Sequence, residues 1–412
     1  MAKINIISGI QLSNNPRVVK EADALTEAGH EVAVFSSILN PVDAPLETAL
    51  SKNKDWTLIP VIDNSIQSFW QRLRWFGARF RCRVWNKIYT ASGWGNVRQL
   101  GYVGPELLEL CRRRKADLNI VHLEQALWVG HQLLKEGERV AIDLEDWYSE
   151  DLSSKDRKSR PSYLLRRWEK RLLQGGCYAT TTSHVLGSAL SEAYNCPPPK
   201  VVYNTFSKYE RDSLDGKAID RTDRKTPSIV WFSQTVGPER GLETLVDALP
   251  KIQIPVQIHI RGRCRPGYED NLRSRMPHDS KHQLFFHPCV PHRELLSRLA
   301  EHDIGFAGEL SHCRSRDLTI TNKIFQYLLA GLVVLASNTA GQKEISDAHP
   351  NLLHTFQGDS ATSLASILNQ IIADQSRIQT DKQEAIKLAE TKYCWEESKH
   401  ILLSSVSDAL AQ

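Results

Sequence analysis

Two basic side chains stand at corresponding turns in the second half of the sequence. Arg240 lies in the segment WFSQTVGPERGLETLVDAL, and Lys323 lies in the segment TNKIFQYLLAGLVVLAS. Each turn follows a strand-like run and leads into a predicted helix, whose free backbone N–H groups form a ready anion site beside a cation. A lone arginine or lysine is more often a solvated surface charge. The matched positions favour anion binding, and two such turns brought together would suit a diphosphate.

The helix that Lys323 begins is expected to be buried. Thr321 is a suitable N-cap, residues 324–330 leave no fully polar face, and Gly331 can end the helix. The aliphatic run 332–336 is typical of a parallel strand covered on both faces. A hydrated lysine at the positive end of a buried helix is unfavourable unless an anion lies there.

Charged residues also follow strand-like segments in the first half. Glu145 and Asp146 come after the predicted strand 140–144, at the end where a ligand would bind. We expect an acceptor-side or catalytic role for them, although acidic loops are commonly just solvated. Asn15 precedes a proline and is expected to open a helix. Arg17 then stands near the positive helix end, which favours a phosphate or a neighbouring carboxylate as its partner.

These residues need a scaffold, and the alternation of short aliphatic strands with helix-length segments predicts it. We expect an α/β chain with two doubly wound parallel sheets, one in each half. Ligands of such sheets bind beyond the carboxyl ends of the strands, so two facing domains would enclose a cleft. The predicted strands are residues 4–8, 31–36, 118–122, 140–144, 179–182, 200–203, 229–232, 256–260, 284–286, 304–307 and 332–336.

The predicted domains follow from this alternation. Residues 1–206 form an N-terminal domain and residues 229–390 a C-terminal domain. Residues 207–228 are charged and poor in large apolar side chains, which is typical of a linker. Residues 391–412 carry a helical apolar stripe that is expected to pack back across the domains.

The composition excludes several classes of protein. The 412 residues include 52 basic and 48 acidic ones, a formal net charge of +4, which is too balanced for a general nucleic-acid binder. The eight cysteines include no C-x-x-C pair, so we expect neither a structural zinc site nor a disulfide framework, and a cytoplasmic location. We expect no transmembrane helix or secretion signal. No G-x-G-x-x-G follows the first strand, which argues against a dinucleotide cofactor.

The motifs in both halves resemble those of one enzyme family. The pattern GxxxERGLExLxxAL, followed by NKIFQYLLAGLVVLAS and GQKEI, is similar to the donor domain of family 4 glycosyltransferases. SNNPRVVKEADALTEAGHEVAVFS is similar to the first strand–helix–strand of that family, and DLEDWYSED resembles a variant of its acceptor-domain loop. The family consists of retaining, metal-independent enzymes with the two-domain GT-B architecture. The resemblance therefore implies that fold, with residues 1–206 as the acceptor-side domain and residues 229–390 as the nucleotide-sugar donor domain.

The resemblance also implies roles for individual residues. His122, in DLNIVHLE, matches the histidine that lies near the donor sugar and the reaction centre in the family. The only co-substrate implied is a nucleotide diphosphate sugar, with no other cofactor and no metal. The residues expected at the donor diphosphate are Arg240, Lys323, Asn322, Thr321, Gln234 and Thr235. Arg17 and Asn15 are expected on the acceptor side, with a phosphate of the donor or acceptor at Arg17.

The sequence departs from the family at the donor sugar. The family commonly has two glutamates eight positions apart, and the matching positions here are Leu318 and Gln326. Gln326 can still form a hydrogen bond with a ribose hydroxyl. Leu318 cannot, which leaves Asp317 or Glu309 to contact the sugar.

The expected function is transfer of a sugar, with retention of configuration, from a nucleotide diphosphate sugar to a hydroxyl of a glycan or lipid-linked acceptor. A nucleotide-sugar 2-epimerase of the same architecture is an alternative, which would act without an acceptor. A non-catalytic nucleotide-sugar binding protein is another, motivated by Leu318 and Gln326.

Residues 69–89 combine basic and apolar side chains without any acidic one. Apolar residues recur at helical spacing among the basic residues Arg72, Arg74, Arg79, Arg81, Arg83 and Lys87. One interpretation is a helix that covers the core of the first domain and has a solvated basic face. The other is an interfacial helix, with aromatic rings at the lipid headgroups and cations on anionic lipid. The second predicts peripheral contact with the inner face of a membrane.

Overall fold

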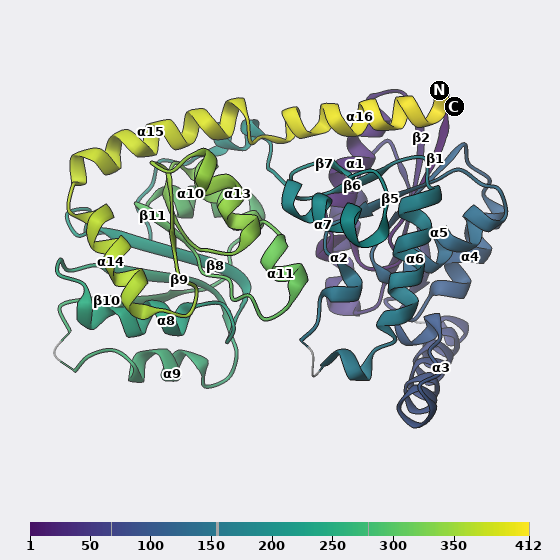
Figure 1. Cartoon of the computed structure of the whole chain (residues 1–412), viewed down its shortest axis with the longest axis horizontal. Coiled ribbons are helices and arrows are strands. Elements are labelled where there is room, and N and C mark those ends of the chain that lie inside the picture. The colour runs from purple at the N-terminus through teal and green to yellow at the C-terminus, as the bar shows by residue number, and fades with distance from the viewer. Residues whose placement is uncertain (67, 154–155, 279, 412) are drawn as a thin grey trace. The chain divides into compact units, whose positions relative to one another are not determined.

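The computed structural model describes residues 1–66, 68–153, 156–278 and 280–411, so residue 412 of the predicted C-terminal segment lies outside it. The chain forms two compact units (Figure 1). The first contains Met1–Val202, Cys313–Ser315 and Lys399–Gln412, and the second contains Tyr203–His312 and Arg316–Ser398. The segment 207–228, expected as a linker, falls within the second unit. Its Arg221 is buried there and pairs with Asp303 at 2.7 Å.

The first unit is built on a sheet of seven parallel strands in the order β3-β2-β1-β4-β5-β6-β7. The strands are β1 (Lys3–Ile7), β2 (Glu31–Ile38), β3 (Thr57–Asp63), β4 (Leu118–His122), β5 (Val140–Leu144), β6 (Ala179–Thr181) and β7 (Lys200–Val201). The helices are α1 (Pro16–Glu27), α2 (Ala44–Ser51), α3 (Phe69–Ser92), α4 (Gly104–Arg113), α5 (Glu124–Lys135), α6 (Ser162–Gly175), α7 (His184–Tyr194) and, from Lys399 onward, α16 (Trp395–Ala411).

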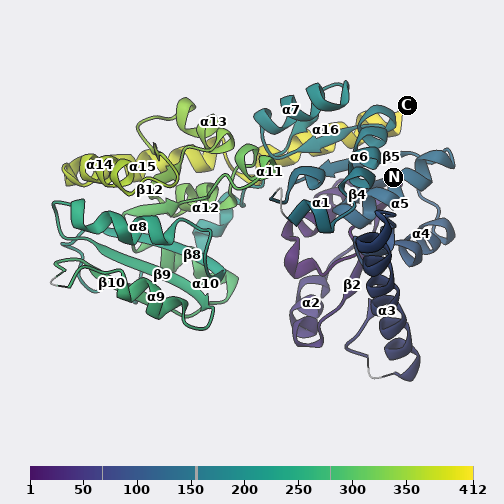
Figure 2. The ribbon, with the colours of Figure 1, turned by 60° about the horizontal axis from the view of Figure 1, so that its bottom comes forward.

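The second unit has a sheet of six parallel strands in the order β10-β9-β8-β11-β12-β13 (Figure 2). The strands are β8 (Ser228–Val236), β9 (Gln257–Cys264), β10 (Gln283–His287), β11 (Ile304–Ala307), β12 (Val333–Ser337) and β13 (Leu353–Phe356). The helices are α8 (Leu242–Ala248), α9 (Tyr268–Ser274), α10 (His292–Ala300), α11 (Arg314–Leu318), α12 (Asn322–Ala330), α13 (Ala340–Ala348), α14 (Ala361–Ile372) and α15 (Gln375–Thr391).

Both faces of the second sheet are buried, as the continuous aliphatic strands predict. Along β12, Val333 and Leu335 pack into one apolar core, and Val334 and Ala336 pack into another. Helix α12 lies in the second of these cores, and every residue of its segment 324–330 is buried. Gly331 ends that helix with φ +75°, in the left-handed region that favours glycine.

The strand order of each sheet indicates where a ligand site can form. In each unit the first strand, β1 or β8, lies between two parallel neighbours, and the chain proceeds to opposite sides of it. The crevice beyond the carboxyl ends of the strands at this point is the usual ligand site of a doubly wound sheet. Among the helices within the described ranges, none is long and apolar enough to cross a bilayer.

Candidate functional site

Three charged residues meet at the switch point of the second unit. Arg240 follows β8, Glu309 follows β11, and Lys323 lies in the first turn of α12. The Glu309 carboxylate bridges the two cations, with Oε1 2.9 Å from Lys323 Nζ and Oε2 3.3 Å from Arg240 Nη1. The sequence predicts an anion at this end of the buried helix, and the structure places the Glu309 carboxylate there.

The Glu309 carboxylate is held in its charged form. Burial alone would raise its pKa, but the charges of Lys323 and Arg240 and the hydrogen bond from Lys323 lower it below the ordinary value. Thr321 is the N-cap of α12, and its hydroxyl donates to Glu309 Oε1 at 3.4 Å instead of capping the helix. The Glu309 backbone N–H donates to Ser337 Oγ at 2.9 Å, which ties the carboxylate to the end of β12.

A cavity of about 340 Å³ adjoins Arg240, a volume suited to a small-molecule ligand. It is lined by Thr235, Gly237, Pro238, Glu239, Arg240, Arg265, His312 and Arg316. Three arginines against one glutamate make the lining basic, which favours an anionic ligand. Arg265 and Arg316 were not predicted as site residues. Arg265 follows the carboxyl end of β9, so the rule that points to Arg240 also points to it.

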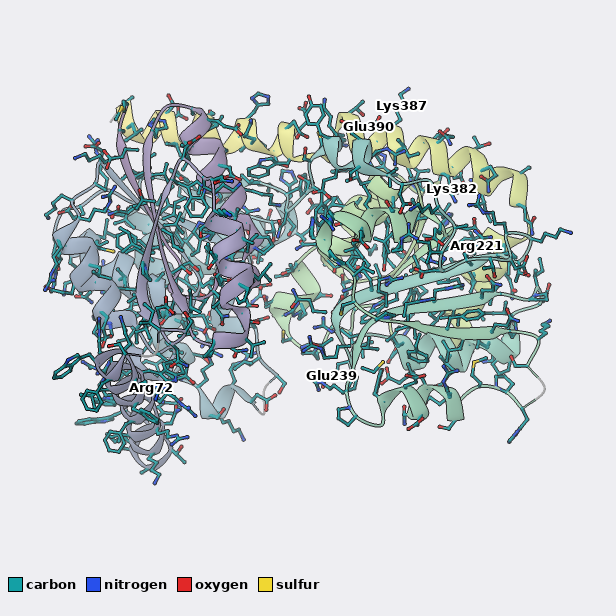
Figure 3. All side chains as sticks on the ribbon, turned by 180° about the vertical axis from the view of Figure 1, so that it is seen from behind. Arg72, Arg221, Glu239, Lys382, Lys387 and Glu390 are labelled. Carbon is teal, nitrogen blue, oxygen red and sulfur yellow. The ribbon has the colours of Figure 1, made fainter. Side chains whose placement is uncertain are left out.

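The loop that carries Arg240 is tightly curled. Glu239, which Figure 3 labels, has φ +68°, and Gly241 has φ +70°. A Cβ at position 241 would lie 3.1 Å from the carbonyl oxygen of Gly308, so the loop packs on the backbone just before Glu309. This close approach explains why residue 241 is a glycine, and it sets the distance between Arg240 and Glu309.

The structure does not place every predicted donor residue beside the cavity. Asn322 and Gln234 are exposed near it, whereas Gln326 is only 1% exposed within α12. The Asp317 carboxylate accepts hydrogen bonds from Ser311 Oγ at 3.0 Å and from the Ala340 backbone N–H at 3.3 Å. Asp317 is therefore already engaged at the start of α13.

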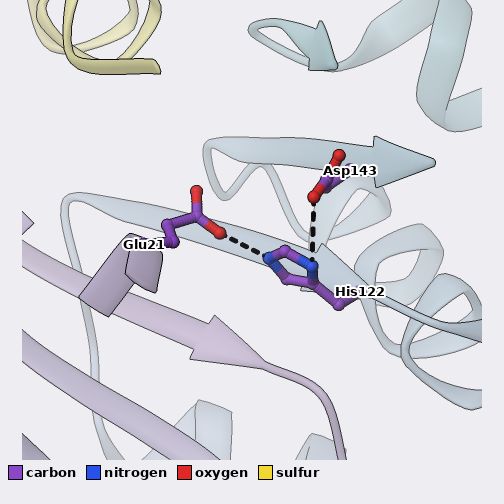
Figure 4. A group of neighbouring side chains, drawn as sticks. All are labelled: Glu21, His122 and Asp143. Atoms are coloured by element: carbon purple, nitrogen blue, oxygen red, sulfur yellow. Dashed lines mark hydrogen bonds and ion pairs between the residues drawn. The ribbon is translucent and has the colours of Figure 1, made fainter. Parts of the chain in front are cut away.

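A second cluster of charges lies at the carboxyl ends of β4 and β5 in the first unit (Figure 4). His122 ends β4 and is completely buried. Its Nε2 lies 2.6 Å from Glu21 Oε2, and its Nδ1 lies 3.3 Å from Asp143 Oδ2 and 3.6 Å from Glu145 Oε1. Burial alone would lower the pKa of His122, but the charges of Glu21 and Asp143 and the hydrogen bond to Glu21 contribute to raising it to about 10. The imidazole is therefore a cation at neutral pH.

Arg17 belongs to the same cluster. Its guanidinium forms a buried salt bridge with Asp143 and donates from Nη1 to the Val202 carbonyl oxygen at 2.7 Å. Of the two partners considered for Arg17, a phosphate or a neighbouring carboxylate, the structure shows the carboxylate of Asp143. Asn15 caps α1 and donates from Nδ2 to Glu145 Oε1 at 2.7 Å.

Two questions about this cluster are whether it could hold a metal ion and which of its residues reach solvent. Glu21, His122 and Asp143 are the group within the described residues whose candidate metal-ligand atoms all lie within 4.8 Å of one another. Glu, His and Asp are ordinary metal ligands, but the buried Arg17 guanidinium already pairs with Asp143, and its charge disfavours a second cation there. Glu145 is 17% exposed and Asp146 is partly exposed, so these two carboxylates border solvent.

The turn after His122 is strained. Leu123 has φ +67° and ψ 166°, a conformation that is almost restricted to glycine. Such strain persists only where the surroundings hold the backbone in place. Leu123 is the single residue between the end of β4 and the start of α5. The position of His122 is therefore set by both the backbone and its ion pairs.

Comparison with known proteins establishes the fold. Neither a protein-family model nor a curated protein sequence matches the chain. Anabaena HepE, solved with UDP, has a TM-score of 0.67 and 15% identity, covering 98% of this chain and 99% of that one. Sucrose-phosphate synthase from Thermosynechococcus elongatus has a TM-score of 0.68 and 14% identity, covering 100% of both chains. A glycosyltransferase from Rickettsia africae has a TM-score of 0.65 and 12% identity, covering 99% and 98%.

The chain has the GT-B fold. The predicted fold class, with two doubly wound parallel sheets, is thereby confirmed. HepE has also been solved with UDP and glucose and with UDP-glucose. At 15% identity or less, the similarity shows the fold alone. The function of this chain must therefore be inferred from its own residues.

Proposed function

We propose that this GT-B chain is a glycosyltransferase that uses a nucleotide diphosphate sugar as donor. The observation that carries the proposal is the pair Lys323 and Arg240, held by one carboxylate beside a basic cavity at the switch point of the second sheet. A donor diphosphate would take the place of Glu309 as the partner of one or both cations. The UDP and UDP-glucose bound by HepE support this choice of ligand.

The proposed chemistry requires stabilisation of a leaving group. The diphosphate gains negative charge as the glycosidic bond breaks, and cations fixed in advance stabilise that transition state. Lys323 and Arg240 would supply this charge, and the exposed backbone near Thr321 and Asn322 would assist. Following the resemblance to family 4, we propose retention of configuration without a metal or other cofactor, and a donor phosphate oxygen that takes the acceptor proton.

The first unit would supply the acceptor side. Glu145 and Asp146 border solvent and are proposed to contact an acceptor hydroxyl of a glycan or lipid-linked molecule. His122 has no exposed surface, so we assign it a positioning role through its Nδ1 contact with Glu145 at 3.6 Å. We propose that the reaction takes place in the cytoplasm.

A thermal-shift screen of nucleotide sugars and nucleoside diphosphates tests donor binding. A ligand that binds only the folded chain at about 100 times its Kd stabilises it by about 2.7 kcal/mol, which gives a clear rise in Tm. We expect at least one nucleotide sugar to raise Tm, and the matching nucleoside diphosphate to do so too. A screen in which neither class of ligand raises Tm would contradict the proposal.

Product analysis then separates the alternatives. Conversion of the nucleotide sugar without an acceptor would identify a 2-epimerase. Donor binding without transfer to a panel of glycan and lipid-linked acceptors would identify a binding protein.

Glu309→Gln should increase the response of the chain to nucleoside diphosphate. The amide keeps the size of the side chain but leaves the cations Lys323 and Arg240 without their shared counter-charge, so the ligand-free variant should have a lower Tm. Phosphate oxygens can restore that charge, so the rise in Tm on adding the ligand should exceed that of the wild type. Equal rises in both proteins would show that the ligand does not contact these cations. Glu344→Gln, on α13, is a control for a lost carboxylate elsewhere in the unit.

A further inference from the structure

Helix α3 presents an apolar face that the first unit does not cover. Phe69, Leu73, Phe76 and Phe80 are 72%, 52%, 65% and 68% exposed. Their spacing of four, three and four residues places them on one side of the helix. Trp70 is 70% exposed next to them. Monomeric proteins rarely leave a contiguous row of large apolar side chains in water.

The opposite side of α3 attaches the helix to its unit. Of the residues of α3, all of which are described, only Ala78 is buried. The Trp75 ring packs against Tyr102 at a centroid distance of 5.0 Å, and Tyr89 Oη donates to the Arg160 carbonyl oxygen at 2.9 Å. Packing on the first unit therefore explains the residues on this side of the helix. It does not explain why the row from Phe69 to Phe80 is apolar.

The charges around the apolar row all have one sign. Residues 69–92 contain six basic residues and no acidic one. Arg81 pairs with Glu106, whereas the exposed side chains of Arg74, Arg79, Arg83 and Lys87 form no salt bridge within the described part of the chain. At 100° per residue, Arg79 and Arg83 lie along one flank of the row, and Lys87 lies in line with it about two turns beyond Phe80. Figure 3, which labels Arg72, shows the side chains of α3 projecting from the unit.

We propose that α3 binds the surface of a membrane that contains anionic lipids. The apolar row would enter the boundary between headgroups and acyl chains, and the flanking arginines and lysine would lie among anionic headgroups. The exposed row is apolar, and the charged residues of its helix are all cations. This combination matches a membrane whose interior is apolar and whose headgroups are anionic. A second copy of the chain is a poor occupant, because pairing two such helices would bring together two sets of six cations, and the helix itself contains no carboxylate to offset them. The proposal does not depend on the donor or the reaction.

Co-sedimentation of the full chain with vesicles tests this assignment. We expect recovery with phosphatidylcholine vesicles that contain phosphatidylglycerol and much less with phosphatidylcholine alone. Binding should weaken in about 1 M salt, where the Debye length falls to about 3 Å. Equal binding to both kinds of vesicle, or binding to neither, would overturn the proposal.

Two double variants locate the binding surface on α3. Phe76→Ser with Phe80→Ser removes half of the apolar row, and Arg79→Glu with Arg83→Glu reverses two flanking charges. Each should lower the partition coefficient on anionic vesicles by at least about tenfold, because each basic residue and each buried apolar group contributes to such binding. The Tm of each should stay close to that of the wild type, since all four side chains are exposed.

Matched controls separate α3 from the rest of the surface. Val42→Ser with Tyr209→Ser removes two side chains that are 81% and 63% exposed elsewhere. Lys170→Glu with Lys387→Glu makes the same change in net charge on α6 and α15. Both controls should bind vesicles like the wild type, and losses equal to those of the α3 variants would overturn the assignment. A lipid-free dimer that dissociates on Phe76→Ser with Phe80→Ser would also overturn it, in favour of a second copy.

Discussion

Replacing Lys323 by alanine should lower kcat/KM for a nucleotide-sugar donor by about tenfold to a hundredfold. A hydrogen bond to a charged group contributes about 1.5–3 kcal/mol, and the Lys323 ammonium is only 12% exposed, so water screens it little. Affinity for the nucleoside diphosphate alone should fall by a similar factor, because the proposed contact is to phosphate. Arg240→Ala should cost less, near the tenfold end, because Arg240 is 39% exposed.

Two features make this measurement selective. Each single variant leaves Glu309 with its other cation, at 3.3 Å or 2.9 Å, so the fold should survive. Lys343→Ala and Arg293→Ala remove exposed cations elsewhere in the second unit and should change neither kcat/KM nor the Kd for nucleoside diphosphate. Kinetics like those of the wild type in both Lys323→Ala and Arg240→Ala would falsify the diphosphate assignment.

The sequence predicts the strands that carry the site and misses two at the edges. The predicted segments 118–122, 140–144 and 304–307 coincide with β4, β5 and β11. These strands are central and fully buried, and apolar residues make up most of each. The missed strands β3 and β13 are at the edges of their sheets. Pro60 interrupts β3, which an edge strand tolerates, and β13 has only four residues.

The sequence also points to the cations of the site but not to what joins them. Arg240 is recognisable because it follows β8 and precedes α8, and Lys323 because it begins the buried helix α12; the strand expected just before Lys323 is instead the short helix α11. Glu309 is 69 and 14 residues away from them, and the sequence suggests only a sugar contact for it. Its bridging position depends on the pairing of β11 with β8 and on the approach of the loop at Gly241 to Gly308. Those are tertiary contacts that no local pattern encodes.

The charge cluster of the first unit shows the same limit. Resemblance places His122 near a reaction centre, and spacing places Arg17 and Glu145 at the same end of the sheet. Full burial of His122 depends on the packing of α1 against β4, which brings Glu21 within 2.6 Å of the ring. Helix periodicity does not predict a buried glutamate at that position, because acidic side chains are seldom inside without a partner.

Asp143→Asn should destabilise the first unit by about 3–5 kcal/mol. Asp143 is the counter-charge of Arg17, faces His122 at 3.3 Å and accepts a hydrogen bond from Thr180 at 2.8 Å. Removing one charge from a buried ion pair leaves the other uncompensated, which is what makes the change costly. Glu109→Gln is the matched control, because it removes the carboxylate of an exposed pair with Arg113 and should cost less than about 1 kcal/mol.

The pH dependence of stability gives a second, independent test of the cluster. The pKa of His122 is raised to about 10 in the folded chain, above the ordinary value of 6.5, so its charge stabilises the folded state fully below pH 6.5. That contribution should be lost as the pH rises from 6.5 towards 10, and His122→Gln should abolish this part of the pH dependence. Urea unfolding followed by hydrogen exchange of peptides from β4 and β5 reports on the first unit alone. If the wild type and His122→Gln lose stability in parallel over this pH range, the imidazole is neutral and the buried cluster does not hold it as a cation.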